Sequence, residues 1–381
     1  MKKLFFWTNY YIEQNDVGTT VKIKNEIQAL RQIGYIVTYT AYISDGVAIF
    51  DNSDSIVVFE KFKFLNSKLV SLTRKDSLIS ICRKYLKNKT FDYFLLRINY
   101  FSSSYMKMLK EMKAQGALVM MESLSYFPGI SHSFFKAPKL YAVAHSLERN
   151  RKELNKCIDL MLTEGHIDDY YGIPCIEFGM GVKVEDFRPH YYCGDKDTLN
   201  MLMVGCTSIY HGTDRILASL KKYLDDSCAN TRVYLHLVGD VLDKDKEYII
   251  TNNLEDHVIL YGRQFGNKLE DIYDKCNVAL GPLSQHRMQK KDTGLKTKEY
   301  FAKGIPYVYS GDEPCIEDDY PYIFEIPNDE SLISIADVWN FYNGICKTDI
   351  VSEMRKTAVE VFEWKNLFKK AFSKLHLESR S

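Results

Sequence analysis

The segment DTGLKTKEYFAKGIP, residues 292–306, combines residue types that could bind a nucleoside diphosphate. A polar loop with one glycine precedes an amphipathic helix, and the N-terminus of a helix offers unpaired N–H groups and partial positive charge to a phosphate. Lys296 adds a cation to this helix start, and Glu299 can accept hydrogen bonds from the two hydroxyls of a ribose. The residues that we expect to surround the phosphates are Gly294, Leu295, Lys296 and Thr297. A capped surface helix explains the segment equally well when it is taken alone.

Four apolar segments that precede this helix would have to position it. They are LNMLMVGCTSIYHGTDRILASLKKYL (199–224), RVYLHLVGD (232–240), HVILYGRQF (257–265) and NVALGPLS (277–284). Each contains a strand followed by a turn that carries glycine, and strands alternating with helices are typical of a parallel, doubly wound sheet. In such sheets ligands bind at the carboxyl ends of the strands, where Gly205 and Gly239 are expected to lie. The segments therefore favour a nucleotide site over a plain surface helix.

The combination and order of these segments, together with TKEYFAKGIPYVYS (297–310), resemble the C-terminal domain of the GT-B glycosyltransferases, specifically the large family four of retaining enzymes. The resemblance implies an α/β fold in which two Rossmann-like, doubly wound domains face a central cleft. It further implies that the C-terminal domain binds a nucleotide sugar, that Lys296 stabilises the leaving diphosphate, and that no metal is needed. The implied donor-binding residues are Gly205, His211, Gly212, Arg215, Gly239, Arg263, Gly294, Leu295, Lys296, Thr297 and Glu299.

The sequence departs from the family pattern at positions that would contact the donor. The family has a first glutamate eight residues before the position of Glu299, where this chain has Lys291. The glycine loop of the family carries an Arg and a Lys, whereas this chain has Cys206 and His211 there. The cations left to neutralise the diphosphate are Lys296, Arg215 and Arg263. These departures leave open a second interpretation, in which the chain is a catalytically degenerate GT-B subunit that binds a glycan or a partner transferase.

The N-terminal half is predicted to form a second α/β domain that binds the acceptor. Gly18 stands where GT-B enzymes keep a glycine-rich turn, although a helix start capped by Thr19 explains it equally well. Arg97 and Glu122 lie near the ends of two apolar strands, on the acceptor side of the expected fold. The sequence ESLSYFP, which begins at Glu122, resembles the Glu-x-Pro-Thr-Tyr-Pro segment of polysaccharide transferases. The resemblance implies that Glu122 contacts an acceptor hydroxyl as a catalytic residue, and a carboxylate that anchors a loop is the alternative.

Two domains are expected from the length of 381 residues, because single hydrophobic cores stop growing beyond about 250–300 residues. The acceptor-binding domain is assigned to residues 1–183 and the nucleotide-sugar-binding domain to residues 184–364. Two helices near 330–344 and 349–378 are predicted in the C-terminal part. By the resemblance, the final segment 365–381 crosses back to the first domain.

Composition and cysteine spacing describe a reduced, globular protein. Apolar residues make up 46% and charged residues 26% of the chain, which is ordinary for a soluble domain. No run of 18 or more apolar residues occurs, and the run Leu4–Trp7 is too short for the core of a signal peptide. The nine cysteines form no CxxC pair, which argues against a disulfide framework or a zinc site. We therefore expect a cytoplasmic protein with no cofactor and no metal.

Charge is divided unevenly although the net charge is zero. Residues 1–185 carry 25 Lys and Arg against 19 Asp and Glu, and the stretch 61–90 is especially basic. Its basic residues are Lys61, Lys63, Lys68, Arg74, Lys75, Arg83, Lys84, Lys87 and Lys89, opposed by Asp76 alone. Such a surface suits an anionic membrane or a lipid-diphosphate acceptor, and a solvated basic helix explains it at least as well. The sequence shows no nucleic-acid recognition motif, so we expect no nucleic-acid partner.

Together these features predict a glycosyltransferase that moves a sugar from a nucleoside-diphosphate sugar to a hydroxyl of a glycan or glycolipid acceptor. The resemblance points to cell-surface polysaccharide synthesis with retention of configuration, in the cytoplasm or peripherally on the inner face of the cell membrane. Besides the degenerate subunit, a nucleotide-sugar epimerase of GT-B fold remains an alternative, which would need additional acidic residues in the cleft.

Overall fold

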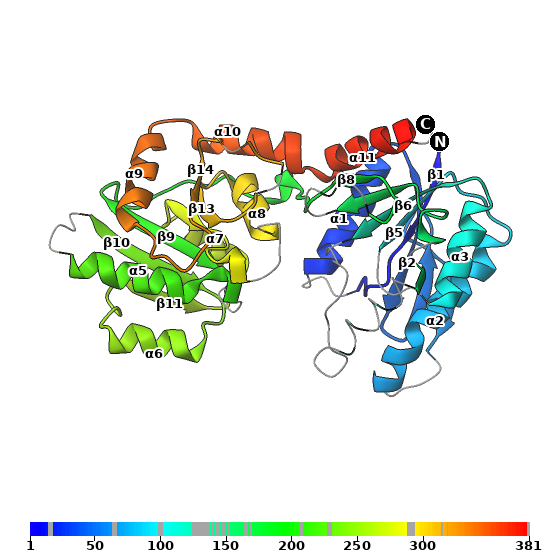
Figure 1. Cartoon of the computed structure of the whole chain (residues 1–381), viewed down its shortest axis with the longest axis horizontal. Coiled ribbons are helices and arrows are strands. Elements are labelled where there is room, and N and C mark those ends of the chain that lie inside the picture. The colour runs from blue at the N-terminus through cyan, green and yellow to red at the C-terminus, as the bar shows by residue number, and fades with distance from the viewer. Residues whose placement is uncertain are drawn as a thin grey trace. The chain divides into compact units, whose positions relative to one another are not determined.

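The chain forms two compact units in the computed structural model, drawn in Figure 1. Unit 1 consists of Met1–Gly179 and Trp364–Ser381, and unit 2 of Met180–Glu363. The residues that the structure describes are 1–13, 18–62, 67–97, 102–123, 138, 141, 145, 149–150, 153–163, 167, 170–205, 209–226, 231–287, 294–313, 315–317 and 319–378.

Unit 1 is built on an eight-stranded sheet with the order β4-β3-β2-β1-β5-β6-β7-β8. Its strands are β1 (Lys3–Trp7), β2 (Ile36–Ile43), β3 (Gly46–Phe50), β4 (Ile56–Lys61), β5 (Tyr93–Arg97), β6 (Leu118–Ser123), β7 (Leu160–Thr163) and β8 (Cys175–Glu177). Neighbouring strands are parallel from β2 to β8, whereas β3 pairs antiparallel with both β2 and β4. The strands β3 and β4 thus extend one side of an otherwise parallel sheet.

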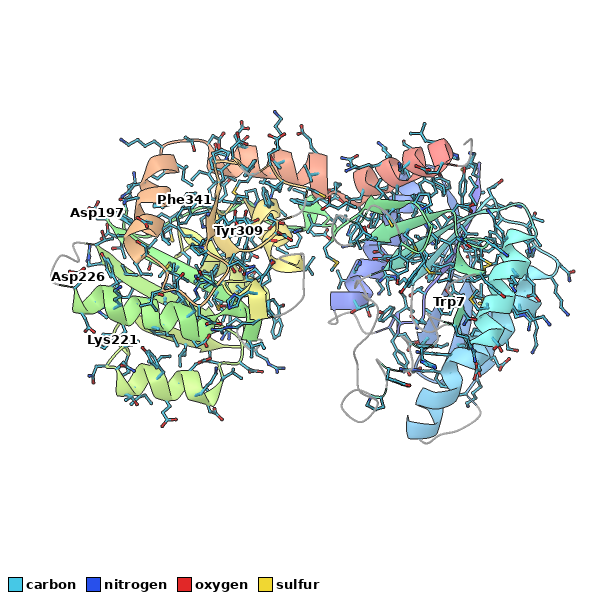
Figure 2. The ribbon with its side chains drawn as sticks, in the orientation of Figure 1. Trp7, Asp197, Lys221, Asp226, Tyr309 and Phe341 are labelled. Atoms are coloured by element: carbon cyan, nitrogen blue, oxygen red, sulfur yellow. The ribbon has the colours of Figure 1, made fainter. Side chains whose placement is uncertain are left out.

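Helices cover both faces of this sheet, because alternate residues of the buried strands point to opposite sides. Along β1, Leu4 and Phe6 pack against α1 (Gly18–Gln32) and α11 (Trp364–Glu378). Phe5 and Trp7 pack on the opposite face, which α2 (Ser67–Leu86) and α3 (Ser103–Lys113) cover. Trp7 accordingly lies in the interior of unit 1 in Figure 2, whereas Lys221 and Asp226 lie at the periphery of unit 2.

Unit 2 is built on a six-stranded parallel sheet with the order β11-β10-β9-β12-β13-β14. Its strands are β9 (Thr198–Val204), β10 (Arg232–Val238), β11 (Val258–Gly262), β12 (Val278–Leu280), β13 (Tyr307–Ser310) and β14 (Ile323–Ile326). The third strand along the chain lies at one edge and the strand order reverses between β9 and β12, which is the doubly wound Rossmann arrangement. The prediction of a parallel, doubly wound sheet in the C-terminal half is therefore confirmed.

Two helical layers enclose the sheet of unit 2. One face packs on α5 (Thr213–Asp225), α6 (Asp243–Thr251) and α9 (Ile335–Ile345). The other packs on α7 (Asn267–Tyr273), α8 (Leu295–Lys303) and α10 (Ile350–Thr357). No helix among the described residues is long and apolar enough to cross a membrane.

The predicted single helix at 349–378 is wrong. After α10 the chain forms a short π-helical turn, Ala358–Phe362, and Glu363 then adopts an extended backbone (φ −62°, ψ 126°) before α11 begins at Trp364. At this point Val182 donates its N–H to the carbonyl of Phe362 (2.9 Å). The interruption coincides with the boundary between the two units, where the chain leaves one hydrophobic core for another.

Candidate functional site

Glycine turns form the carboxyl edge of the sheet in unit 2. The N–H of Gly205 donates to the carbonyl of Val238 (2.6 Å), and the N–H of Gly239 donates to the carbonyl of Gly262 (2.7 Å). All three glycines have positive φ, a region that side chains disfavour. The carboxyl ends of β9, β10 and β11 are thereby joined by backbone hydrogen bonds at the edge where doubly wound sheets bind ligands.

The start of α8 meets this edge through Lys296. Its Nζ donates to the carbonyl of Gly205 (2.8 Å) and lies 3.0 Å from Nε2 of His211. A lysine ammonium can only donate, so Nε2 of the buried His211 accepts this hydrogen bond. The structure thus brings together three residues that the sequence predicted for donor binding, although 91 positions separate Gly205 from Lys296.

The remaining predicted residues of this helix start have defined positions. Gly294, with φ 80°, immediately precedes α8 and provides no side-chain cap. The hydroxyl of the buried Thr297 donates to the carbonyl of Gly294 (3.2 Å), and Leu295 is partly buried. The start of α8 therefore combines a helix N-terminus with a lysine whose ammonium reaches the carboxyl edge of the sheet, an arrangement suited to an anion.

Glu299 lies one turn further along α8 and is partly buried. Among the described residues, its carboxylate has neither a hydrogen bond nor an ion pair. Burial raises its pKa to about 7; the nearby carboxylate of Glu270 acts in the same direction, and Lys303 and Lys296 oppose it. A carboxylate that is removed from water without hydrogen bonds has unused acceptor capacity, which donors of a ligand can satisfy.

Arg215 and Arg263 have partners elsewhere. The guanidinium of buried Arg215 donates to the carbonyl groups of Leu283, Pro327 (2.9 Å) and Ser331 (2.6 Å). Arg263, at the end of β11, pairs with Asp240 through Nε (2.8 Å) and Nη2. Arg215 therefore anchors the backbone near 327–331, and Lys296 is the predicted cation that the structure places at the start of α8.

Gly212 has a steric role at the start of α5. It adopts φ 68°, and a Cβ built on it would lie 2.7 Å from Oγ of Ser284 and 3.0 Å from Cβ of Leu283. A larger residue would push the start of α5 away from the loop after β12. Because His211 directly precedes Gly212, the same displacement would disturb the contact with Lys296.

The acceptor-side residues of unit 1 belong to a buried cluster of four charges. Nζ of Lys22 lies 2.6 Å from Glu122 and 3.7 Å from Glu26, and Nη2 of Arg97 lies 3.2 Å from Glu122 and also pairs with Glu26. All four side chains are buried. They come from the ends of β5 and β6 and from α1, which begins at Gly18.

This cluster changes what Glu122 can do. Burial raises the pKa of Glu122, but the positive charges of Arg97 and Lys22 outweigh it, so the pKa lies below its usual value. Burial leaves the pKa of Glu26 above its usual value. Both oxygens of Glu122 are engaged and its basicity is reduced, which suits a residue that holds α1 against the sheet better than a general base.

Sequence reasoning missed Lys22 and Glu26. Their spacing of four on a helix is a common signal for a surface ion pair, and nothing in it indicates burial against Arg97. Several residues of the sequence argument, namely Cys206, Lys291 and the segment 124–128, lie outside the described residues. Within the described part of the chain, no group of three or more His, Cys, Asp or Glu side chains could hold a metal ion.

Solved structures share this architecture over the whole chain. A glycosyltransferase from Rickettsia africae ESF-5 has 14% sequence identity and a TM-score of 0.65, with 100% of this chain and 99% of that chain covered. Sucrose-phosphate synthase from Thermosynechococcus elongatus has 13% identity and a TM-score of 0.61, with both chains covered completely. The chain has the GT-B fold. The contacts of Lys296 with Gly205 and His211, at the carboxyl edge of the sheet, lie in the second of its two Rossmann-like units.

A third GT-B protein, HepE from Anabaena, was crystallised in complex with UDP-glucose. It has 12% identity and a TM-score of 0.56, with 99% of this chain and 100% of that chain covered. No protein-family model and no curated protein sequence matches the chain. At these identities the likeness concerns the GT-B fold, and the chemistry has to be argued from the residues of this chain.

Proposed function

We propose that the chain is a glycosyltransferase that moves a sugar from a nucleoside-diphosphate sugar to a hydroxyl of a glycan or glycolipid. The observation that carries the proposal is the start of α8, where Lys296 contacts Gly205 and His211 one turn before Glu299, whose carboxylate has no partner among the described residues. A cation at a helix N-terminus suits a diphosphate, and a carboxylate with acceptor capacity suits the hydroxyls of a ribose. The complex of HepE with UDP-glucose, on the same fold, supports a uridine nucleotide as the first donor to test.

The proposed mechanism rests on stabilisation of the leaving group. Negative charge builds on the diphosphate as the glycosidic bond to the donor breaks, and Lys296 and the first N–H groups of α8 are fixed where they can oppose it. His211 orients the ammonium of Lys296, and Glu299 holds the ribose. Retention of configuration and the absence of a metal requirement are part of the proposal, on the resemblance to family four.

Unit 1 is proposed to bind the acceptor, with the cluster around Glu122 and Arg97 fixing the carboxyl ends of β5 and β6. A role in polysaccharide synthesis and a cytoplasmic location, peripheral on an anionic membrane surface, belong to the same proposal. Part of the basic stretch has other partners: Arg83 pairs with Glu111 (2.6 Å), and the guanidinium of Arg74 lies 5.0 Å from the centre of the Tyr42 ring. Among the side chains of this stretch that the structure describes, the exposed lysines are Lys61, Lys84, Lys87 and Lys89, and Lys84 lies 3.8 Å from Glu60.

A binding subunit without catalysis is the second candidate. The engagement of Arg215 and Arg263 by other groups favours it, because few cations are then available for a leaving diphosphate. Thermal unfolding with a panel of nucleoside diphosphates tests binding, since a ligand at about 100 times its Kd stabilises the fold by about 2.7 kcal/mol. Hydrolysis and transfer from UDP-glucose then test catalysis.

Turnover of a nucleotide sugar distinguishes the transferase from the subunit without catalysis. A transferase stabilised by UDP should release UDP from UDP-glucose, and Lys296→Ala should abolish most of that release. Lys268→Ala, at an exposed lysine of α7 in the same unit, is the matched control and should keep it. Stabilisation by UDP with no turnover of any donor would favour the subunit without catalysis, and no stabilisation by any nucleoside diphosphate would contradict the transferase.

A further inference from the structure

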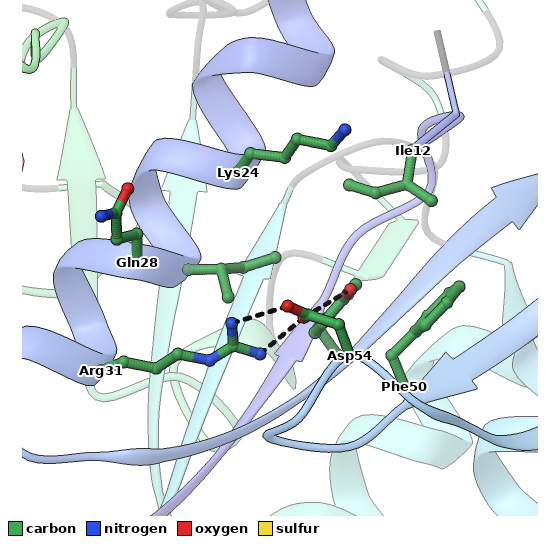
Figure 3. Close-up of a pocket in the computed structure, with 8 residues that line it drawn as sticks. Ile12, Lys24, Gln28, Arg31, Phe50 and Asp54 are labelled. Carbon is green, nitrogen blue, oxygen red and sulfur yellow. Dashed lines mark hydrogen bonds and ion pairs between the residues drawn. The ribbon is translucent and has the colours of Figure 1, made fainter. Parts of the chain in front are cut away.

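A pocket of about 630 Å³ opens in unit 1 between α1 and the edge of the sheet, shown in Figure 3. Its size lies within the range of sites for small molecules, about 300–1,000 Å³. Ile27, Gln28 and Arg31 line it from α1, and Tyr39 and Phe50 line it from β2 and β3.

The pocket is separate from the buried charge cluster. Successive residues of a helix are about 100° apart, so Lys22 and Glu26 share one flank of α1, while Gln28 and Arg31 lie on the opposite flank. Ile27 lies between the two flanks and packs into the core under the helix. The proposed acceptor edge and the pocket therefore lie on opposite sides of the same helix.

The wall formed by Arg31 and Asp54 is fixed by hydrogen bonds. Nη2 and Nη1 of Arg31 donate to the two oxygens of Asp54 (2.7 and 3.1 Å), and the hydroxyl of Tyr39 also donates to Asp54 (2.9 Å). Asp54 adopts φ 61°, which costs a non-glycine residue energy that the surrounding contacts must offset. The adjacent turn is held by Asp51, which accepts hydrogen bonds from the N–H groups of Ser53 (2.9 Å) and Ser55 (3.1 Å). A wall built in this way is ready for a ligand without rearrangement.

The floor of the pocket is aromatic and aliphatic. Tyr39 and Phe50 face each other across β2 and β3, with ring centroids 4.9 Å apart and planes 6° from parallel. Ile12 and Ile27 complete the apolar part of the lining. The faces of such rings are electron-rich and attract the weakly positive C–H groups of a saturated ring.

The rim adds polar groups whose capacity is unused. Within the described part of the chain, the amide of exposed Gln28 has no hydrogen-bond partner, and the side chain of Asp54 is 58% exposed, so its carboxylate can accept further hydrogen bonds. A purely apolar ligand would use neither group. A phosphate would meet the carboxylate of Asp54, which already neutralises Arg31, and the lining holds one further cation, Lys24. A neutral ring with an apolar face and several hydroxyls satisfies both the floor and the rim.

We propose that this pocket binds one pyranose ring of a glycan, as a carbohydrate site distinct from both the donor site and the acceptor edge. The C–H face of the sugar packs on the aromatic pair, and its hydroxyls bond to the amide of Gln28 and donate to the exposed carboxylate of Asp54. The site needs no sugar transfer to operate, so it goes beyond the proposed function. If transfer also occurs, the site holds a part of the glycan that does not react.

Saturation-transfer NMR on the full chain tests the site with methyl glycosides of glucose, galactose, mannose, rhamnose and N-acetylglucosamine. At least one glycoside should receive saturation from the protein. Phe50→Leu keeps the apolar volume but removes the aromatic face, and it should abolish the transfer. Phe59→Leu, at an exposed phenylalanine of the same hairpin, is the matched control and should leave it unchanged.

A second variant guards against loss of folding in Phe50→Leu. Gln28 is exposed, so Gln28→Ala should keep the fold and weaken binding about fivefold, as expected for loss of one hydrogen bond of about 1 kcal/mol. The absence of saturation transfer to every glycoside would overturn the proposal, and so would transfer that survives both Phe50→Leu and Gln28→Ala. Glu299→Ala should weaken UDP binding but not sugar binding, so failure of the proposed function is distinguishable from failure of this site.

Discussion

Replacing Glu299 by Gln should stabilise unit 2 at alkaline pH while weakening nucleotide binding. Burial raises the pKa of Glu299 from 4.5 to about 7, which is a shift of about 2.5 units. At 1.36 kcal/mol per unit, ionised Glu299 destabilises the fold by about 3 kcal/mol relative to its neutral form. Glutamine keeps the shape and cannot ionise, so Glu299→Gln removes that cost.

The effect has a defined pH window. A raised pKa means that the folded state binds the proton more tightly than the unfolded chain does. The stability associated with the neutral carboxyl is complete below about pH 4.5, and it is lost as pH rises through about 7. Glu299→Gln should therefore match the wild type near pH 4.5 and exceed it most at pH 8.5.

Calorimetry between pH 5 and 8.5 measures the difference in Tm between Glu299→Gln and the wild type. The transition to compare is that of unit 2, which is expected to be the one whose Tm rises when UDP is added. For a unit of this size about 3 kcal/mol corresponds to a rise of roughly 6–12 °C in Tm at pH 8.5. Glu255→Gln, at an exposed glutamate of the same unit, is the matched control and should change Tm little at either pH. If Glu299→Gln changes Tm relative to the wild type by the same amount at pH 5 and at pH 8.5, or lowers Tm at pH 8.5, the reasoning is refuted.

Nucleotide binding should change in the opposite direction. The ionised carboxylate is the better acceptor for ribose hydroxyls, so loss of its charge should weaken UDP binding by about 1–3 kcal/mol at pH 8.5. In the wild type, UDP affinity should rise as pH passes through about 7, where Glu299 ionises. Titration calorimetry checks both, and an affinity independent of pH and of the substitution would separate Glu299 from the ribose.

Three further predictions concern other parts of the chain. Lys296→Ala should lower kcat for UDP release at least tenfold in steady-state kinetics while shifting Tm by only a few degrees, because its charge matters most when the diphosphate leaves. Arg97→Met leaves Glu122 buried with one cation fewer and should destabilise unit 1 by about 3–5 kcal/mol in urea unfolding; an unchanged midpoint would show that the buried cluster contributes little. The double substitution Lys84→Glu and Lys87→Glu should reduce sedimentation with anionic vesicles at low salt and leave UDP binding unchanged, and equal sedimentation with neutral vesicles would remove the membrane from the proposal.

The parallel sheet of unit 2 could be predicted because each of its strands is a short apolar run followed by a glycine turn. The antiparallel strands β3 and β4 were not foreseen, although Asp45-Gly46 between two apolar runs is a hairpin signal. The next strand, β4, is largely exposed, Phe59 included, so it does not have the apolar pattern of a buried strand.

The candidate site was predictable in part. Lys296 was identified because a helix start with a cation binds anions, whatever the rest of the chain does. Its contact with His211 and the burial of Glu299 depend on packing between α8 and loops that are distant in sequence. Nothing in the sequence of this helix indicates that Glu299 is removed from water, so the raised pKa of its carboxyl could not be predicted. Lys22 was missed for the same reason, since its partner Glu122 is 100 positions away.

The two crossings between the units have a consequence for synthesis of the protein. Val182 and Glu363 pair side by side, so unit 2 is a contiguous insertion within unit 1. The helix α11, which covers one face of the first sheet with Leu367, Phe368 and Phe372, is translated after the whole of unit 2. Domains usually fold in the order in which they leave the ribosome. Here the second unit can complete its core while the first still exposes the apolar face that α11 will cover, so the strands of unit 1, although they are translated before unit 2, reach their final packing after it.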